Sequence, residues 1–137
     1  MKKQLICLIL CLFSLSNTVY AAHWVLVDQN VEANVYVDTD TVVQTGDHLF
    51  YWEREILNDI FEGRKKVLRK DEVILSSPKR QSRQLEFYGY DPQDREISQD
   101  TTPTSFLFVA PVSVVDHIID FALQYARPWE GSDKPAP

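Results

Sequence analysis

The chain has 137 residues and a formal net charge of −6, with 20 acidic and 14 basic residues. This length predicts one domain, and a hydrophobic content of 45% is enough for a packed core without a covalent staple. The acidic balance disfavours nucleic acid as a partner, because phosphate repels a negatively charged protein at long range.

The first 21 residues have the layout of a secretory signal peptide. Two lysines follow Met1, residues 5–15 are almost entirely apolar, and Val19-Tyr20-Ala21 resembles a signal-peptidase site. The apolar run is too short to cross a bilayer as a helix, and no later segment is as apolar as a membrane span. We therefore expect cleavage after Ala21 and export to the periplasm or to the cell surface. Both cysteines, Cys7 and Cys11, would leave with the signal, so the exported domain would be free of disulfides.

Short β-branched and aromatic runs predict strands in the first half of the exported domain. These runs cover residues 23–28, 34–38, 41–44 and 48–54. Gly46 lies between the last two runs, where a tight hairpin requires a residue that tolerates positive φ. A loop is expected over residues 58–64, because Gly63 interrupts the pattern there.

The next candidate strand, residues 65–75, has four consecutive charges at its centre. The segment Arg69-Lys70-Asp71-Glu72 would direct charges to both faces of a sheet, which is costly for a regular buried strand. An edge position, a β-bulge or a bend near residues 69–72 would relieve this cost. The sequence leaves these three alternatives open.

Two more strands are predicted further along the chain. They cover residues 82–90 and 105–109, and a polar surface loop over residues 91–104 separates them. In the first of these strands, simple alternation places Gln84 on the same face as Glu86 and Tyr88.

Helical spacing begins only after Pro111. Ser113 and Asp116 form an N-cap pattern, and Arg127-Pro128 ends the helix. The apolar stripe of this helix consists of Val115, Ile118, Ile119, Ala122 and Ala126. Because the stripe must be buried, the expected fold class is α+β: an antiparallel sheet of about six strands with one C-terminal amphipathic helix packed on it. The domain is expected over residues 22–129, followed by a disordered tail over residues 130–137.

The order of several features along the chain is informative in itself. In sequence they are Trp24, Val35-Tyr36-Val37-Asp38, the Gly46 hairpin, Trp52, Arg80 and Arg83 before a strand that ends at Tyr90, and Pro111-Val112-Ser113. This order resembles the surface-adhesin protein E family of exported Gram-negative proteins. The resemblance implies an antiparallel sheet with one C-terminal helix, and binding to extracellular-matrix or serum proteins of a host. It also implies a cysteine pair that ties helix to sheet, which this chain lacks near Ser77 and near Ala122-Leu123.

Catalytic and metal-binding patterns are weak. Ser76-Ser77-Pro78-Lys79 matches the S-x-x-K pattern, but the partner motifs of that chemistry are missing from the sequence. The histidines at positions 23, 48 and 117 lack the spacing of a metal site. We therefore expect a protein that is not an enzyme and that uses neither a cofactor nor a metal ion.

Charge segregation is the strongest functional signal in the sequence. Eight of the 14 lysines and arginines lie in one stretch: Arg64, Lys65, Lys66, Arg69, Lys70, Lys79, Arg80 and Arg83. On neighbouring strands they would form a surface for an anionic partner, such as a sulfated glycan, a lipid head group or an acidic protein segment. The alternative is a solvated edge that discourages aggregation.

These observations together predict an exported, non-catalytic binding module that contacts host or envelope macromolecules. The competing hypothesis is a periplasmic domain with a structural or small-ligand-binding role that is never displayed on the cell surface. The oligomeric state does not follow from the sequence.

Overall fold

The computed structural model describes residues 22–76 and 78–128. The expected signal peptide and the expected tail over residues 130–137 therefore lie outside the described residues. Within the described ranges, no helix combines the length and apolar character needed to cross a membrane.

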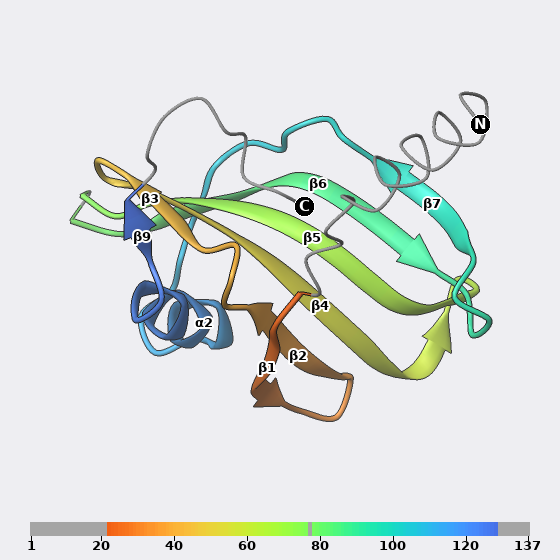
Figure 1. The fold of residues 1–137 in the computed structure, drawn as a ribbon. Coiled ribbons are helices and arrows are strands. Elements are labelled where there is room, and N and C mark those ends of the chain that lie inside the picture. The colour runs from red at the N-terminus through yellow and green to blue at the C-terminus, as the bar shows by residue number, and fades with distance from the viewer. Residues whose placement is uncertain (1–21, 77, 129–137) are drawn as a thin grey trace, which may run out of the picture.

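Six strands form the body of an antiparallel sheet, in the order β1-β2-β4-β5-β6-β7 (Figure 1). Their bounds are β1 (Trp24–Gln29), β2 (Ala33–Asp38), β4 (His48–Phe61), β5 (Arg64–Ile74), β6 (Gln81–Tyr90) and β7 (Glu96–Asp100). Three short strands extend the sheet: β3 (Val43–Thr45) pairs with β4, β8 (Leu107–Phe108) with β6, and β9 (Arg127–Pro128) with β3. Helix α2 (Val114–Leu123) is the one helix in the described part of the chain. The predicted α+β class, with a C-terminal helix, is confirmed.

The hairpin between β4 and β5 is longer than the sequence predicted. The expected loop over residues 58–64 is wrong, because β4 continues to Phe61 and β5 begins at Arg64. The turn consists of Glu62 and Gly63, whose φ angles are 49° and 77°. Two successive residues with positive φ match the twist of the flanking strands, so the chain reverses without a longer loop.

The charged centre of β5 lies inside the sheet, between β4 and β6, so the edge-strand alternative is wrong. The β-bulge alternative is confirmed, because the pairing of β5 with β6 shifts register between Lys70 and Asp71. The bulge makes Gln84 the partner of Asp71, while Glu86 pairs with Lys70. Gln84 and Glu86 therefore lie on opposite faces, which corrects the face predicted for Gln84.

The second half of the chain contains more strand than expected. The segment predicted as a loop over residues 91–104 contains β7, which pairs with β6. The strand predicted over residues 105–109 shrinks to the two residues of β8. The helix ends at Leu123, and the following residues form β9 beside β3. β7 was not predicted because its segment is polar and is flanked by two prolines. An edge strand can have such a sequence, since it needs little apolar side-chain area.

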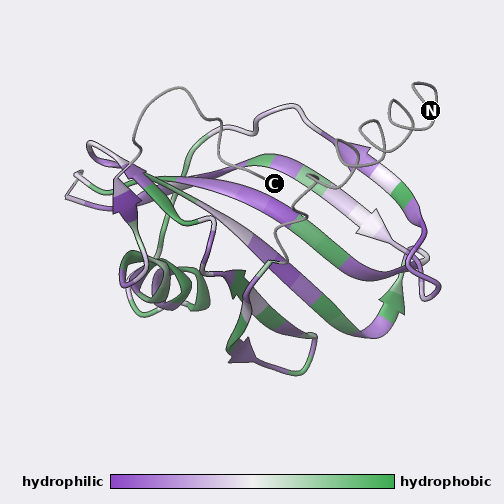
Figure 2. Ribbon diagram, in the orientation of Figure 1, coloured by the Kyte–Doolittle hydropathy of each residue, from purple (hydrophilic) through white to green (hydrophobic). Residues whose placement is uncertain are grey.

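The hydrophobic core lies between α2 and one face of the sheet, which we call the helix face. Figure 2 shows the alternating hydrophobic and hydrophilic bands of the long strands that supply it. Ile118, Ile119 and Ala122 of α2 are buried as predicted. They belong to the same cluster as Val35, Val37, Val42, Leu49, Tyr51, Val73 and Val109. Val115 was predicted to belong to this buried stripe, but it is 41% exposed.

The N-cap of α2 offers a direct test of the helix boundary. The Ser113 hydroxyl accepts a hydrogen bond from the backbone N–H of Asp116 at 3.2 Å, as predicted. Ser113→Ala is expected to lower the free energy of unfolding by about 1 kcal/mol, because this N–H loses its acceptor. Urea unfolding measures the change, and Thr101→Ala at an exposed loop position serves as the control. Equal stability of the two variants would contradict the assigned cap.

Candidate functional site: a charged pocket beside the helix

The eight basic residues predicted as an anionic-partner surface lie in several environments. Six contact carboxylates: Arg64 with Glu62, Lys66 with Asp94, Arg69 with Glu53 and Glu55, Lys70 with Glu86, Arg80 with Asp116 and Asp120, and Arg83 with Glu72. The Lys65 ammonium donates to the carbonyl oxygen of Asn58 at 2.8 Å, and the Lys79 ammonium lies 6.0 Å from the ring centre of Phe108. Most of these neutralising carboxylates come from other strands, from the turn before β7 or from α2, so the sequence did not indicate the pairs; Glu62, two residues before Arg64, is the exception. Binding of an anionic partner stays a prediction.

On the face of the sheet away from α2, cations pack against aromatic rings. The Arg54 guanidinium lies between the rings of Trp24 and Tyr36, at 4.7 and 4.6 Å from their centres. The Lys66 ammonium lies 4.8 Å from the centre of the Tyr90 ring. These contacts order the side chains of this sheet face, and they engage its cations within the protein itself.

A pocket of about 310 Å³ lies on the helix face, next to α2. Its floor consists of Tyr51, Glu53, Arg69 and Asp71, from β4 and β5. Its walls are Ser82, Arg83 and Gln84 of β6, Thr104, Ser105 and Leu107 before α2, and Val115 of α2. The volume is at the lower end of the range for small-molecule sites.

Strand register brings the floor of this pocket together. Glu53 of β4 lies directly opposite Arg69 of β5, and Tyr51 lies opposite Asp71. The β-bulge then places Gln84 of β6 on the other side of Asp71. Directly opposed side chains of neighbouring strands share a face and lie within contact distance. The three strands therefore direct one phenol, one amide and two carboxylates to the same space.

Carboxylates outnumber cations at the floor. Arg69 contacts both Glu53 and Glu55, the latter at 2.8 Å. Asp71 has no salt bridge to any residue that the structure describes. Burial, aided by Asp71 and Glu55, outweighs the attraction of Arg69 and raises the pKa of Glu53 to about 8. Burial likewise raises the pKa of Asp71 to about 6. Glu53 is therefore mostly protonated at neutral pH, which removes part of the excess negative charge at the floor of the pocket.

Two polar groups at the floor lack partners within the described chain. The buried Nε of Arg69 makes no hydrogen bond. Tyr51 is 2% exposed and lines the pocket, and its hydroxyl, unlike the Arg69 Nε, is not fully shielded there; it makes no hydrogen bond to another described residue. Burial, aided by the charges of Asp71 and Glu53, raises the pKa of Tyr51, so the hydroxyl stays protonated. Buried polar groups normally have partners, so these two groups are available to a molecule bound in the pocket.

Exposed apolar side chains are concentrated in residues 107–115, from β8 to the first turn of α2. We call them the apolar rim: Leu107, Phe108, Val112, Val114 and Val115, exposed by 71, 70, 97, 46 and 41%. Leu107 and Val115 also line the pocket, so this part of the rim is continuous with it. Val112 has a φ of 62°, which is unusual for a β-branched residue, and its N–H donates to Asp116 Oδ2 at 3.0 Å. Grouped exposure of this kind marks an interaction surface.

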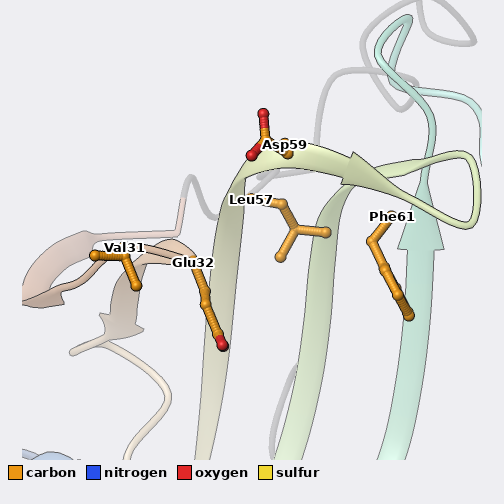
Figure 3. Close-up of a pocket in the computed structure, with 5 residues that line it drawn as sticks. All are labelled: Val31, Glu32, Leu57, Asp59 and Phe61. Carbon is orange, nitrogen blue, oxygen red and sulfur yellow. The ribbon is translucent and has the colours of Figure 1, made fainter.

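A second cleft, of about 420 Å³, lies at the far end of β4 (Figure 3). It is lined by Val31, Glu32, Leu57, Asp59 and Phe61. Figure 3 shows Leu57 and Phe61 pointing to the same side of the sheet, while Asp59 points away. This cleft has two carboxylates but no opposing cation and no amide or hydroxyl in its lining. The pocket beside α2, with its converging polar groups, is the better-defined candidate site.

Arg69 and Arg83 of this pocket were among the site residues predicted from the sequence, whereas Tyr51, Glu53, Asp71 and Gln84 were not. One available signal was Glu53 itself, an acidic residue at an alternation position shared with Leu49 and Tyr51. Comparisons of the chain with protein-family models, curated proteins and solved structures give no match.

Proposed function

We propose that this chain is an exported, non-catalytic binding module of the surface-adhesin protein E type, which contacts a macromolecule of the host or of the bacterial envelope. The apolar rim is the observation that carries this proposal. Its five side chains lie within residues 107–115, and each is at least 41% exposed. Burying such a surface against a partner releases water from apolar area, which is the main source of association energy.

The apolar rim is preorganised by contacts within the protein. Strand β8 pairs with β6, where Phe108 lies opposite Gln81 and Leu107 opposite Ser82. Asp116 accepts from the N–H of Val112 and contacts Arg80 at 2.9 Å, which fixes the turn that leads into α2. A preformed surface loses little conformational entropy on binding. Lys79 beside Phe108 and Arg80 beside the turn place part of the predicted anionic-partner surface next to the rim.

Site-specific photocrosslinking in producing cells tests this proposal. A photoreactive residue at Phe108 is expected to give a discrete crosslinked product, whereas one at Gln93, in an exposed turn, gives none. Adding Leu107→Asp is expected to reduce the yield at position 108 by about tenfold or more, because a charge replaces an apolar contact. The melting temperature should stay unchanged, since Leu107 is 71% exposed. Equal crosslinking at both positions would contradict the proposal.

The pocket favours a second candidate function, a periplasmic small-ligand-binding domain that is never displayed. Treating intact cells with protease distinguishes surface display from periplasmic retention. Digestion of the protein in intact cells supports display, whereas full protection until the outer membrane is opened supports the periplasmic alternative.

A further inference from the structure

We infer that the pocket beside α2 binds a primary ammonium group, supplied by a small free amine or by a lysine side chain of a partner protein. The lysine source rests on the function proposed above, whereas the free-amine source does not. Three features of the pocket support the inference: its charge, its unpartnered polar groups and the apolar character of its mouth.

Charge comes first. With Glu53 protonated at neutral pH, Glu55 and Asp71 still face a single nearby guanidinium, that of Arg69. Arg83 also borders the pocket, but its Nε donates to Glu72 at 2.5 Å. A bound monovalent cation would therefore supply positive charge that the protein itself does not provide. In a buried environment this attraction is stronger than at an exposed surface.

The polar groups match the donors of an ammonium ion. An ammonium has three N–H donors and no acceptor. Asp71 offers a carboxylate without a salt bridge within the described chain, and Tyr51 and Gln84 flank it on the neighbouring strands. The Tyr51 hydroxyl oxygen and the Gln84 amide oxygen are acceptors beside that carboxylate. Tyr51 is 2% exposed and lines the pocket, so its hydroxyl is available to a ligand there.

The apolar side chains at the mouth of the pocket favour an organic cation over a metal ion. Leu107 and Val115 line it, and both extend into the apolar rim. Their side chains suit the methylene chain of an alkylamine or of lysine, whose stem packs on apolar surface while its charge is satisfied elsewhere. Within the described ranges, no group of His, Cys, Asp and Glu side chains is arranged to hold a metal ion.

The first test is a nuclear magnetic resonance titration of the purified protein with n-butylammonium chloride. We expect saturable shift changes at the amides of Tyr51, Asp71 and Gln84 below about 20 mM ligand. The neutral isostere n-butanol is expected to cause no saturable change at these amides. Absence of saturation with n-butylammonium, or an equal response to n-butanol, would overturn the inference.

Two variants locate the binding. Asp71→Asn is expected to weaken n-butylammonium binding by about tenfold or more, because it removes the negative charge but keeps the shape. Tyr51→Phe removes only one hydroxyl oxygen and is expected to weaken binding by about threefold. Asp94→Asn, which affects the exposed ion pair with Lys66, is the control and should leave the affinity unchanged. Wild-type affinity in both pocket variants would refute the assigned site.

A tripeptide with lysine between two leucines separates the two sources of the ammonium group. Tighter binding than n-butylammonium, with the gain lost in Leu107→Asp, supports a partner's lysine. Equal or weaker binding supports a free amine. A protein that binds n-butylammonium but fails the crosslinking test at Phe108 disproves the proposed function alone, and the reverse result disproves this inference alone.

Discussion

Arg69→Met is expected to lower the free energy of unfolding by about 3 kcal/mol at pH 8. The guanidinium contacts Glu53 and Glu55, and the Glu53 side chain is only 3% exposed. Removing the cation leaves a buried carboxylate without its compensating charge, which is far costlier than losing a surface pair. Urea unfolding at pH 8 measures the loss, and at pH 5 the loss should be smaller because Glu53 is then protonated in the folded protein.

Lys66→Met is the matched control for this prediction. Lys66 contacts Asp94, whose side chain is 76% exposed, so its loss should change stability by about 0.5 kcal/mol or less. Adding Glu53→Gln to Arg69→Met should restore part of the lost stability, because one fewer buried carboxylate then lacks a partner. Similar losses in the two single variants would show that the pocket charges are as solvated as those at the surface.

The second large effect is a fall in stability between pH 5 and pH 8. The ordinary pKa of the glutamate carboxyl is 4.5, whereas in the folded protein the pKa of Glu53 is about 8. Between these values the folded protein holds a proton that the unfolded chain has released, so stability decreases as pH rises. The contribution of Glu53 over this range is roughly 3 kcal/mol. The raised pKa of Asp71 acts in the same direction at lower pH.

Glu53→Gln isolates this contribution, because glutamine keeps the shape of the protonated acid and does not titrate. The variant is expected to lose less stability than the wild type between pH 5 and pH 8, as measured by urea unfolding at several pH values. The pKa values of Asp47 and Asp91 are lowered, by hydrogen bonds from Ser76 and from the Arg95 backbone, so these residues affect stability only in more acidic solution. Parallel pH profiles for variant and wild type would contradict the assignment.

The fold was predictable where local sequence and burial agree. Alternation and the Gly46 turn gave the first strands, and the Ser113 cap with Ile118, Ile119 and Ala122 gave the helix and its buried face. β7 and the last residues of β4 were missed, because polar edge strands and long hairpin arms have no strong hydrophobic period. Gly63 marked the right place for the turn, but its length depends on Glu62 adopting positive φ, which few side chains favour.

The site was less predictable than the fold, since it depends on pairing between distant strands. The charges of β5 indicated that something irregular was present, and a bulge was one of three possibilities. Only the register places Glu53 against Arg69 and Tyr51 against Asp71, and only the bulge turns Gln84 toward them. A shift by one residue would move all of these side chains to the other face. The basic stretch was visible in the sequence, but its carboxylate partners were not.

The excess of buried carboxylate at the floor of the pocket is the property on which the binding inference depends. Carbon-13 nuclear magnetic resonance of the labelled Glu53 side-chain carboxyl, followed as a function of pH, measures it most directly. The structure predicts a titration midpoint near pH 8 in the free protein, and a lower midpoint when n-butylammonium is bound. A midpoint at or below the ordinary glutamate value of 4.5 would show that Arg69 fully compensates the floor, and would contradict the assignment of the pocket as a cation site.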